Sequence, residues 1–345
     1  MSLKSEILEQ PEVLGRLLGD GMSQIKEIAR EILSKDIAYI FLAARGTSDN
    51  AGLYAKYLWG AHNRIPTALA TPSLFSIYEK PPNLREGFVV GISQSGESPD
   101  IVRVIEEGSR QNAPTLAITN NPTSPLAKAA KYVINLDCGP EVAIAATKTY
   151  TAQLMAIAML SVALEGDNKR LHDLERVRDW VSSVLTMDSK ISSIVERFRD
   201  IQQCVVLGRG YNYATAFEWA LKLKELTYAM AEPYSSADFQ HGPVAIISKG
   251  FPVFAIVPAG MVYSDMMSLL KRLALENEVE LLVISNVDSA LKLAHSSISI
   301  PSDIPEWLSP MVSIVPAQLI CVHIARLKGI DIEKPRGLRK VTRTW

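Results

Sequence analysis

The chain repeats itself at a nearly constant distance. The segment IFLAARG at 40–46 resembles VVLGRG at 205–210, and the two arginines, Arg45 and Arg209, are 164 residues apart. Three further pairs of matching segments follow in the same order, at offsets of 164 to 166 residues. Since a repeat of this length is as long as a whole domain, the sequence predicts two folding units of the same architecture.

Each copy alternates short Val/Ile/Leu-rich runs with longer helical segments. This alternation predicts an α/β fold class, with each copy a flavodoxin-like three-layer α/β/α domain around a parallel sheet. Ligands of such sheets bind beyond the carboxyl ends of the strands, so functional residues are expected there. The predicted strands are 39–44, 88–92, 115–118 and 132–136 in the first copy and 204–207, 252–257, 281–284 and 298–300 in the second.

The copies and the segments around them predict a five-part organisation. A helical segment precedes the first copy, a charge-rich helical connector joins the copies, and a short tail ends the chain. The predicted parts are 1–34 (N-terminal helices), 35–165 (first domain), 166–195 (connector), 196–330 (second domain) and 331–345 (tail).

Charge and cysteine content exclude several classes of protein. Thirty-six basic and 37 acidic residues among 345 give a net charge of −1, which favours neither nucleic acid nor an anionic membrane as partner. The cysteines (Cys138, Cys204 and Cys321) lack the spacing of a disulfide framework or a zinc site, so we expect no metal and no cofactor. The N-terminus lacks the apolar core of a signal peptide, and the apolar stretch 154–164 is too short to span a membrane. These features predict a cytoplasmic protein.

A predicted buried strand stops abruptly in a serine-rich turn, in FVVGISQSGES at 88–98. The next residues predict a helix with Ser98 as N-cap and Pro99 at its first position. Serine hydroxyls and the amides of a helix N-terminus together suit a phosphate monoester. The turn lacks the Gly-Lys-Ser/Thr of a nucleotide loop and the glycine spacing of a dinucleotide fingerprint. The alternative is a turn that only caps the helix.

The second copy helps to decide between a phosphate site and a turn that only caps the helix. Its corresponding loop, Val257–Gly260, carries no hydroxyl group. A requirement of the fold would have kept the two loops alike. We therefore expect a ligand at the first loop.

An apolar helix predicted over Ala214–Met230 carries three ionisable side chains. Glu218, Lys222 and Glu225 lie at i, i+4 and i+7, within roughly 60° of one another around the helix. Buried charges must pair or line a polar cavity. The alternative is a surface ion pair, which Lys224 on the opposite side favours.

A histidine follows this helix in ADFQHGP, before a strand-like run at 244–247. Because histidine titrates near neutral pH, His241 is a candidate acid/base group. The alternative is a solvated loop histidine.

Six motifs together resemble the sugar isomerase (SIS) family, and within it the isomerase part of the glutamine–fructose-6-phosphate aminotransferases. The resemblance covers residues 35–340. The motifs are SQSGES (93–98), EVAIAATKTYT (141–151), LGRG (207–210), EWALKLKE (218–225), QHGP (240–243) and KPRGLRK (334–340).

The resemblance implies a role for each motif. By it, the phosphate of a sugar is bound by Ser93, Gln94, Ser95 and Ser98, and the sugar is contacted by Thr47, Ser48 and Ala146. A further set is implied to carry the chemistry: Glu225 as the base between C1 and C2, His241 as the ring-opening acid/base, Lys340 as the Schiff-base lysine, and Glu218 and Lys222 as a supporting network.

The implied activity is the interconversion of glucosamine 6-phosphate with fructose 6-phosphate and ammonia, most simply as a deaminase. Two departures lie at Ser98, where the family has threonine, and at Ala146, where it has serine. We also expect no N-terminal glutaminase domain. The alternatives are a fructosamine-6-phosphate deglycase or other amino-sugar phosphate isomerase, a synthase subunit fed by a separate glutaminase, and a non-catalytic sugar-phosphate sensor. The resemblance also implies a homodimer with shared active sites.

Overall fold

The computed structural model describes residues 2–342, which divide into two compact units. The N-terminal unit comprises Glu9–Val142, Ala146–Arg176 and the tail from Arg339. The C-terminal unit comprises the residues up to Leu8, Ala143–Ala145 and Val177–Leu338. The five-part division of the sequence stays a prediction.

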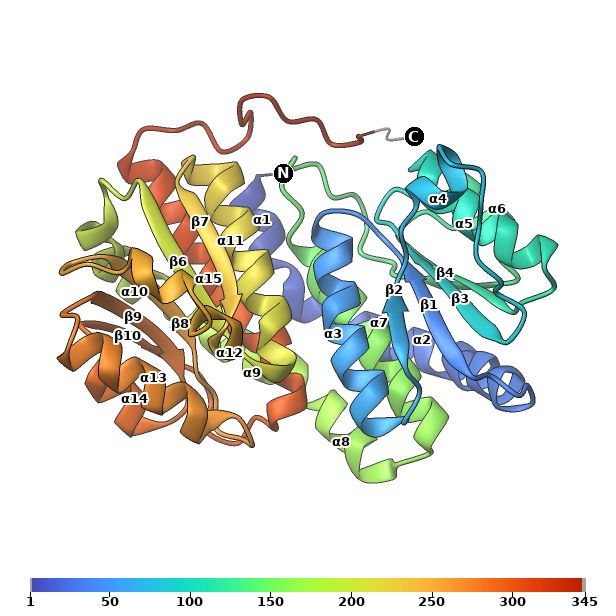
Figure 1. The fold of residues 1–345 in the computed structure, drawn as a ribbon, viewed down its shortest axis with the longest axis horizontal. Coiled ribbons are helices and arrows are strands. Elements are labelled where there is room, and N and C mark those ends of the chain that lie inside the picture. Colours follow the sequence, from blue (N-terminus) through green and yellow to red (C-terminus); the bar gives the residue numbers. More distant parts are fainter. Residues whose placement is uncertain (1, 343–345) are drawn as a thin grey trace. The chain divides into compact units, whose positions relative to one another are not determined.

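The N-terminal unit is built on a parallel sheet with the strand order β2-β1-β3-β4-β5. Helices α3 and α7 pack together on one side, whereas α4, α5 and α6 pack together on the other (Figure 1). The strands are β1 (Tyr39–Ala43), β2 (Thr67–Leu69), β3 (Gly87–Ile92), β4 (Thr115–Thr119) and β5 (Tyr132–Asn135). The helices are α2 (Gln10–Leu33), α3 (Thr47–His62), α4 (Ser73–Ser76), α5 (Pro99–Arg110), α6 (Pro125–Ala129), α7 (Lys148–Glu165) and α8 (Asn168–Glu175).

The C-terminal unit has the equivalent parallel sheet, in the order β7-β6-β8-β9-β10. The strands are β6 (Gln203–Gly208), β7 (Met230–Ser235), β8 (Pro252–Ile256), β9 (Glu280–Ser285) and β10 (Ser296–Ser299). The α-helices are α1 (Leu3–Leu8), α9 (Val177–Leu185), α10 (Asp188–Ile194), α11 (Tyr213–Thr227), α12 (Ser236–Phe239), α13 (Tyr263–Leu275), α14 (Asp288–Leu293) and α15 (Ser309–Leu327). Short 3-10 helices are η1 (Val195–Phe198), η2 (Gly210–Asn212), η3 (Pro243–Ile246) and η4 (Glu306–Leu308).

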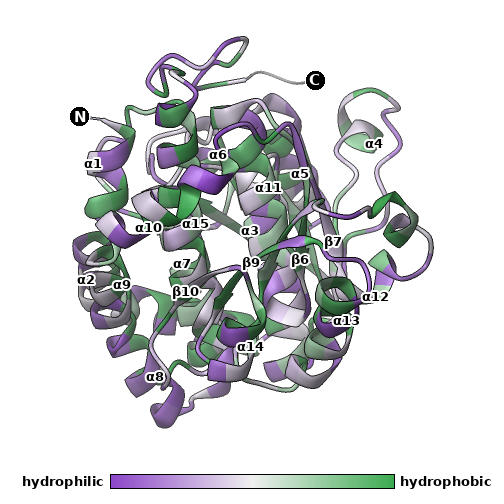
Figure 2. Ribbon diagram, turned by 90° about the vertical axis from the view of Figure 1, so that its left-hand side faces the viewer, coloured by the Kyte–Doolittle hydropathy of each residue, from purple (hydrophilic) through white to green (hydrophobic). Residues whose placement is uncertain are grey.

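The predicted fold class is confirmed, since both sheets are parallel and share the strand order 2-1-3-4-5 of flavodoxin-like domains. The segment predicted to connect the copies is helical, and its first helix, α8, is hydrophilic (purple in Figure 2). Each sheet, however, has one strand more than predicted. The missed strands, β2 and β7, both lie at a sheet edge.

Two further predictions about local structure are wrong. The helix expected to reach Met230 ends at Thr227, because Tyr228 adopts a left-handed conformation (φ 58°) and Met230 begins β7. The strand-like run 244–247 forms most of the 3-10 helix η3.

Helix α15 is the most apolar long helix of the described chain. The sequence prediction overlooked this helix and singled out the stretch 154–164 instead. With η4 it forms one stretch, Glu306–Leu327, that is long and apolar enough to cross a membrane. The window that meets this test is entirely buried inside the protein, as in a core helix. The stretch 154–164 lies within α7, a helix that is also almost wholly buried.

Candidate active-site residues

The serine-rich loop lies at the carboxyl end of β3, immediately before α5. Ser93 Oγ accepts a hydrogen bond from the Gly96 amide (3.1 Å), and Ser95 Oγ accepts one from the Glu97 amide (3.3 Å). These bonds fold the loop into a compact turn. Gly96 has φ +66°, and a Cβ there would lie 2.1 Å from Ser124 Oγ, so only glycine fits.

Ser98 occupies the N-cap position of α5 in extended conformation, as predicted, but its side chain makes no capping hydrogen bond. An N-cap serine normally satisfies one of the first amides of its helix. Here the hydroxyl makes no such bond, so a capping role does not account for Ser98, and the phosphate site stays a prediction. Gln94 holds the loop through its carbonyl, which accepts from the Asn120 amide (3.1 Å).

Sequence reasoning missed an ion pair beside this loop. Arg45 Nε lies 2.8 Å from Asp100 Oδ2, with the carboxylate fully buried and the arginine side chain 46% exposed. The pair ties the end of β1 to the first turn of α5. Its signal in the sequence was the arginine of the repeated Arg-Gly, at Arg45 and Arg209, which was used only to align the copies.

The residues implied to contact the sugar open two helices of the same unit. Thr47 and Ser48 begin α3, and the buried Ser48 Oγ accepts a hydrogen bond from Gln153 of α7 (2.9 Å). Ala146 lies two residues before α7. The N-terminal unit therefore brings together the ends of α3, α5 and α7 that the prediction singled out, at the carboxyl edge of its own sheet.

Lys340, in the tail, makes an ion pair within the N-terminal unit. Its Nζ lies 2.8 Å from Oε2 of Glu141, whose side chain is fully buried. The other lysine of this region, Lys148, is 1% exposed and pairs with Glu9 (2.6 Å). Of the two, Lys340 is the more accessible, with 25% of its side chain exposed.

The polar stripe of α11 is a buried ionic triad. Lys222 Nζ lies 3.3 Å from Glu218 Oε1 and 2.5 Å from Glu225 Oε2. Burial alone would lower the pKa of Lys222, but the two carboxylates outweigh it and raise that pKa above its usual range. Glu218 and Lys222 are essentially inaccessible, whereas 19% of the Glu225 side chain is exposed. The surface-pair alternative is therefore wrong.

His241 follows α12 and is exposed. Its backbone amide donates to the Asp238 carbonyl (3.0 Å), which places it in the turn that the sequence predicted. Within residues 2–342, no hydrogen bond or ion pair joins the His241 side chain to the α11 triad.

The second repeat closes its corresponding loop with its own carboxylate. The Met261 amide donates to Glu306 Oε2 (2.8 Å), and a Cβ on Gly260 would lie 2.2 Å from the same carboxyl group. The place where an anion would approach this loop is thus taken by Glu306. Sequence reasoning missed this residue, which lies 45 positions after Met261.

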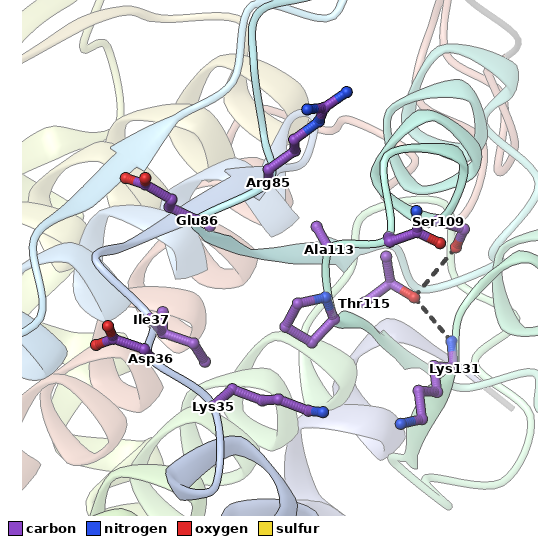
Figure 3. Close-up of a pocket in the computed structure, with 12 residues that line it drawn as sticks. Lys35, Asp36, Ile37, Arg85, Glu86, Ser109, Ala113, Thr115 and Lys131 are labelled. Atoms are coloured by element: carbon purple, nitrogen blue, oxygen red, sulfur yellow. Dashed lines mark hydrogen bonds between the residues drawn. The ribbon is translucent and has the colours of Figure 1, made fainter.

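A pocket of about 480 Å³ opens at the opposite edge of the first sheet (Figure 3). Lys35 and Lys131 reach into it from two sides, and Arg85, Asp36 and Glu86 mix both charges in its lining. It lies at the amino ends of β1, β3, β4 and β5, whereas ligands of parallel sheets bind at the carboxyl ends. We therefore do not assign it to the reaction.

The described residues offer no metal site, since no cluster of three or more His, Cys, Asp or Glu side chains among them could hold an ion. All three cysteines are buried, and burial raises the pKa of the Cys204 thiol to about 12. Thiols held protonated in this way are poor nucleophiles.

Similar proteins match nearly the whole chain. The glutamine–fructose-6-phosphate aminotransferase [isomerizing] of Thermus thermophilus is 32% identical over 97% of this chain, and that of Gloeobacter violaceus is 34% identical over 97%. The chain spans only 57% of the length of either relative. The C-terminal domain of glucosamine-fructose-6-phosphate aminotransferase from Francisella tularensis has a TM-score of 0.87 at 28% identity, with 96% of this chain and 98% of that one covered.

A glucosamine-6-phosphate deaminase from Thermotoga maritima shares the fold, with a TM-score of 0.80 over the full length of both chains, at 22% identity. The SIS domain family matches this chain twice, at residues 33–163 and 197–327. These two matches coincide with the two sheets and their helices. The chain therefore belongs to the SIS domain family, with two SIS domains in tandem.

Proposed function

We propose that this protein converts glucosamine 6-phosphate and water into fructose 6-phosphate and ammonia, or runs the reverse reaction. The observation that carries the proposal is the α11 triad. The ammonium of the buried Lys222 lies 2.5 Å from Oε2 of Glu225, and 19% of the Glu225 side chain remains exposed. A carboxylate that is held in position and open to solvent suits a proton transfer between adjacent carbons.

In the proposed mechanism, the loop of Ser93, Ser95 and Ser98 binds the phosphate and fixes the substrate from its unreactive end. His241 donates a proton to the ring oxygen while water takes the proton of the C1 hydroxyl, which opens the ring to the C1 aldehyde. Glu225 then removes the proton from C2 as the C1 oxygen takes up a proton from water, which gives an enolamine. Glu225 returns its proton to C1 as the nitrogen loses one proton to water, which leaves a C2 imine. Water adds to that imine, and ammonia leaves.

We assign Lys340 to the reverse direction, in which its amine condenses with the C2 carbonyl of fructose 6-phosphate and releases water. Ammonia then displaces the lysine from C2. Relatives named for transfer of an amino group to fructose 6-phosphate support this substrate. By the family resemblance, we also propose a homodimer in which the exposed His241 serves the partner's site.

The test is to incubate the purified protein with glucosamine 6-phosphate and to measure ammonia and fructose 6-phosphate together. We expect the two products in equal amounts, and neither from Glu225→Gln. Fructose 6-phosphate binding without any turnover would instead indicate a sensor. Release of a different amine from a fructosamine 6-phosphate would indicate the deglycase.

A further inference from the structure

The carboxylate of Glu141 has two separate tasks in the N-terminal unit. Its Oε1 accepts hydrogen bonds from the amides of Thr147 (2.9 Å) and Thr149 (3.1 Å). Its Oε2 accepts from Thr149 Oγ1 (2.8 Å) and from Lys340 Nζ (2.8 Å). One oxygen thus faces the start of α7, and the other faces the tail.

The first task fixes the carboxylate in place. Thr147, the N-cap residue of α7, makes no side-chain capping bond, so Glu141 supplies the missing acceptor for the Thr149 amide in the first turn. The positive end of the helix dipole stabilises a negative charge there. Since the side chain is fully buried, the second oxygen is held in one position.

The second task selects one lysine. Lys148 begins α7, but its ammonium is buried and paired with Glu9, so it does not compete for Glu141. Lys340 reaches the same carboxylate across 199 residues of sequence. A charge-assisted bond to a fixed, buried acceptor is strong enough to hold a short tail segment.

We propose that Glu141 is a positioning residue that docks Lys340, and with it the tail residues 339–342, at the N-terminus of α7 before substrate arrives. The docked amine then lies at the N-terminus of α7, which begins two residues after Ala146, the residue that the family resemblance assigns to the sugar. This inference rests on the proposed function for the role of Lys340, but the docking itself does not.

Glu141→Gln tests the docking without removing the helix cap. The amide oxygen can still accept from Thr147 and Thr149, whereas the amide NH₂ faces the ammonium of Lys340 as donor against donor. Trypsin cleavage after the exposed Arg339, followed by mass spectrometry without any substrate, should become about tenfold faster. Lys340→Met removes the other partner of the ion pair without changing α7, and it should give the same increase in the cleavage rate. The double variant should be cleaved no faster than either single variant.

Glu165→Gln is the matched control, because it makes the same change at a carboxylate that pairs with Arg170 at the other end of α7 and should leave tail cleavage unchanged. Cleavage of Glu141→Gln at the wild-type rate would overturn the docking. In a second assay, borohydride with fructose 6-phosphate should modify Lys340 about tenfold more slowly in Glu141→Gln, with half-saturation at the same sugar concentration. If wild-type protein gives no adduct on Lys340, the proposed role of that lysine fails while the protease result still decides the docking.

Discussion

Each repeat carries an equivalent loop at the carboxyl edge of its own sheet, but the two loops differ in their chemistry. The first loop has three serines before α5, and the side chain of Ser98, at the N-cap position, makes no capping hydrogen bond. The second has lost the hydroxyls and covers its loop with Glu306, whose carboxylate accepts the Met261 amide. We propose that the first loop receives an anion from a ligand, whereas the second already accepts the carboxylate of Glu306.

The helices that follow the first strands of the two repeats differ in the opposite sense. At the 164-residue offset, Glu218 and Lys222 of α11 correspond to Tyr54 and Leu58 of α3, all four of them buried. Where the helix of the first repeat buries hydrophobic side chains, the helix of the second repeat thus buries part of an ionic triad. Duplication allowed each copy to specialise: we infer that the first binds the phosphate and the second moves the proton.

The largest effect is expected from Glu225→Gln. Without an ionisable group at this position, turnover of glucosamine 6-phosphate should fall about 10³-fold, the usual worth of general acid–base catalysis. Lys224→Gln, an exposed change on the same helix, is the control and should keep normal turnover. A Glu225→Gln variant with normal turnover would contradict the assignment of the proton transfer to the second repeat.

Lys222→Met should lower the free energy of unfolding by about 3 kcal/mol, because it leaves two carboxylates without their shared buried partner. Leu58→Met, at the corresponding place in α3, should cost less than about 1.5 kcal/mol. Urea unfolding of both variants checks the difference. Equal losses would mean that the triad contributes no more than ordinary packing.

The same triad predicts a dependence on alkaline pH. The folded-state pKa of Lys222 is raised above the unfolded value of 10.5. Its contribution to stability is therefore complete below that pH and is lost as the pH rises through the folded pKa. Above pH 10.5, the stability of wild-type protein should fall more steeply than that of Lys222→Met. Parallel curves for the two proteins would contradict the raised pKa.

A matched pair of glycine substitutions separates the two loops. Gly96→Ala forces a Cβ at positive φ against Ser124, the N-cap of α6, and should cost about 2 kcal/mol and at least tenfold in phosphate affinity. Gly260→Ala also forces a Cβ at positive φ (153°) and against Glu306, so it should lower stability as well, but an unchanged phosphate affinity is expected. An equal loss of affinity in both variants would contradict the division between the loops.

The smallest effect is expected from Glu306→Ala. Met261 is exposed, so its amide can turn to water, and the cost should be about 0.5–1 kcal/mol. Phosphate should still not bind at the second loop, because its hydroxyls are missing. A phosphate bound there in this variant would show that Glu306 alone keeps anions out.

Periodicity and the repeat were enough to predict the sheets, since the central strands are continuous apolar runs. The edge strands were missed because β2 is only three residues long and β7 contains Glu232 and Pro233. The end of α11 was missed because its left-handed C-cap is Tyr228, where a glycine would have given the signal.

For the site, local motifs predicted the loop before α5 and the α11 stripe. The pairs Arg45–Asp100 and Glu141–Lys340 were invisible because their partners are 55 and 199 residues apart. Such contacts depend on how the folded sheet edge gathers its loops, and no spacing rule in the sequence records that.

The division of tasks is tested most directly by the affinity for fructose 6-phosphate, measured by calorimetry on wild type, Glu225→Gln and Ser93→Ala/Ser95→Ala. If the first repeat binds the phosphate and the second carries the chemistry, Glu225→Gln keeps the wild-type affinity within about threefold, and the serine variant loses at least about tenfold. A Glu225→Gln protein that loses as much affinity as the serine variant would contradict the account.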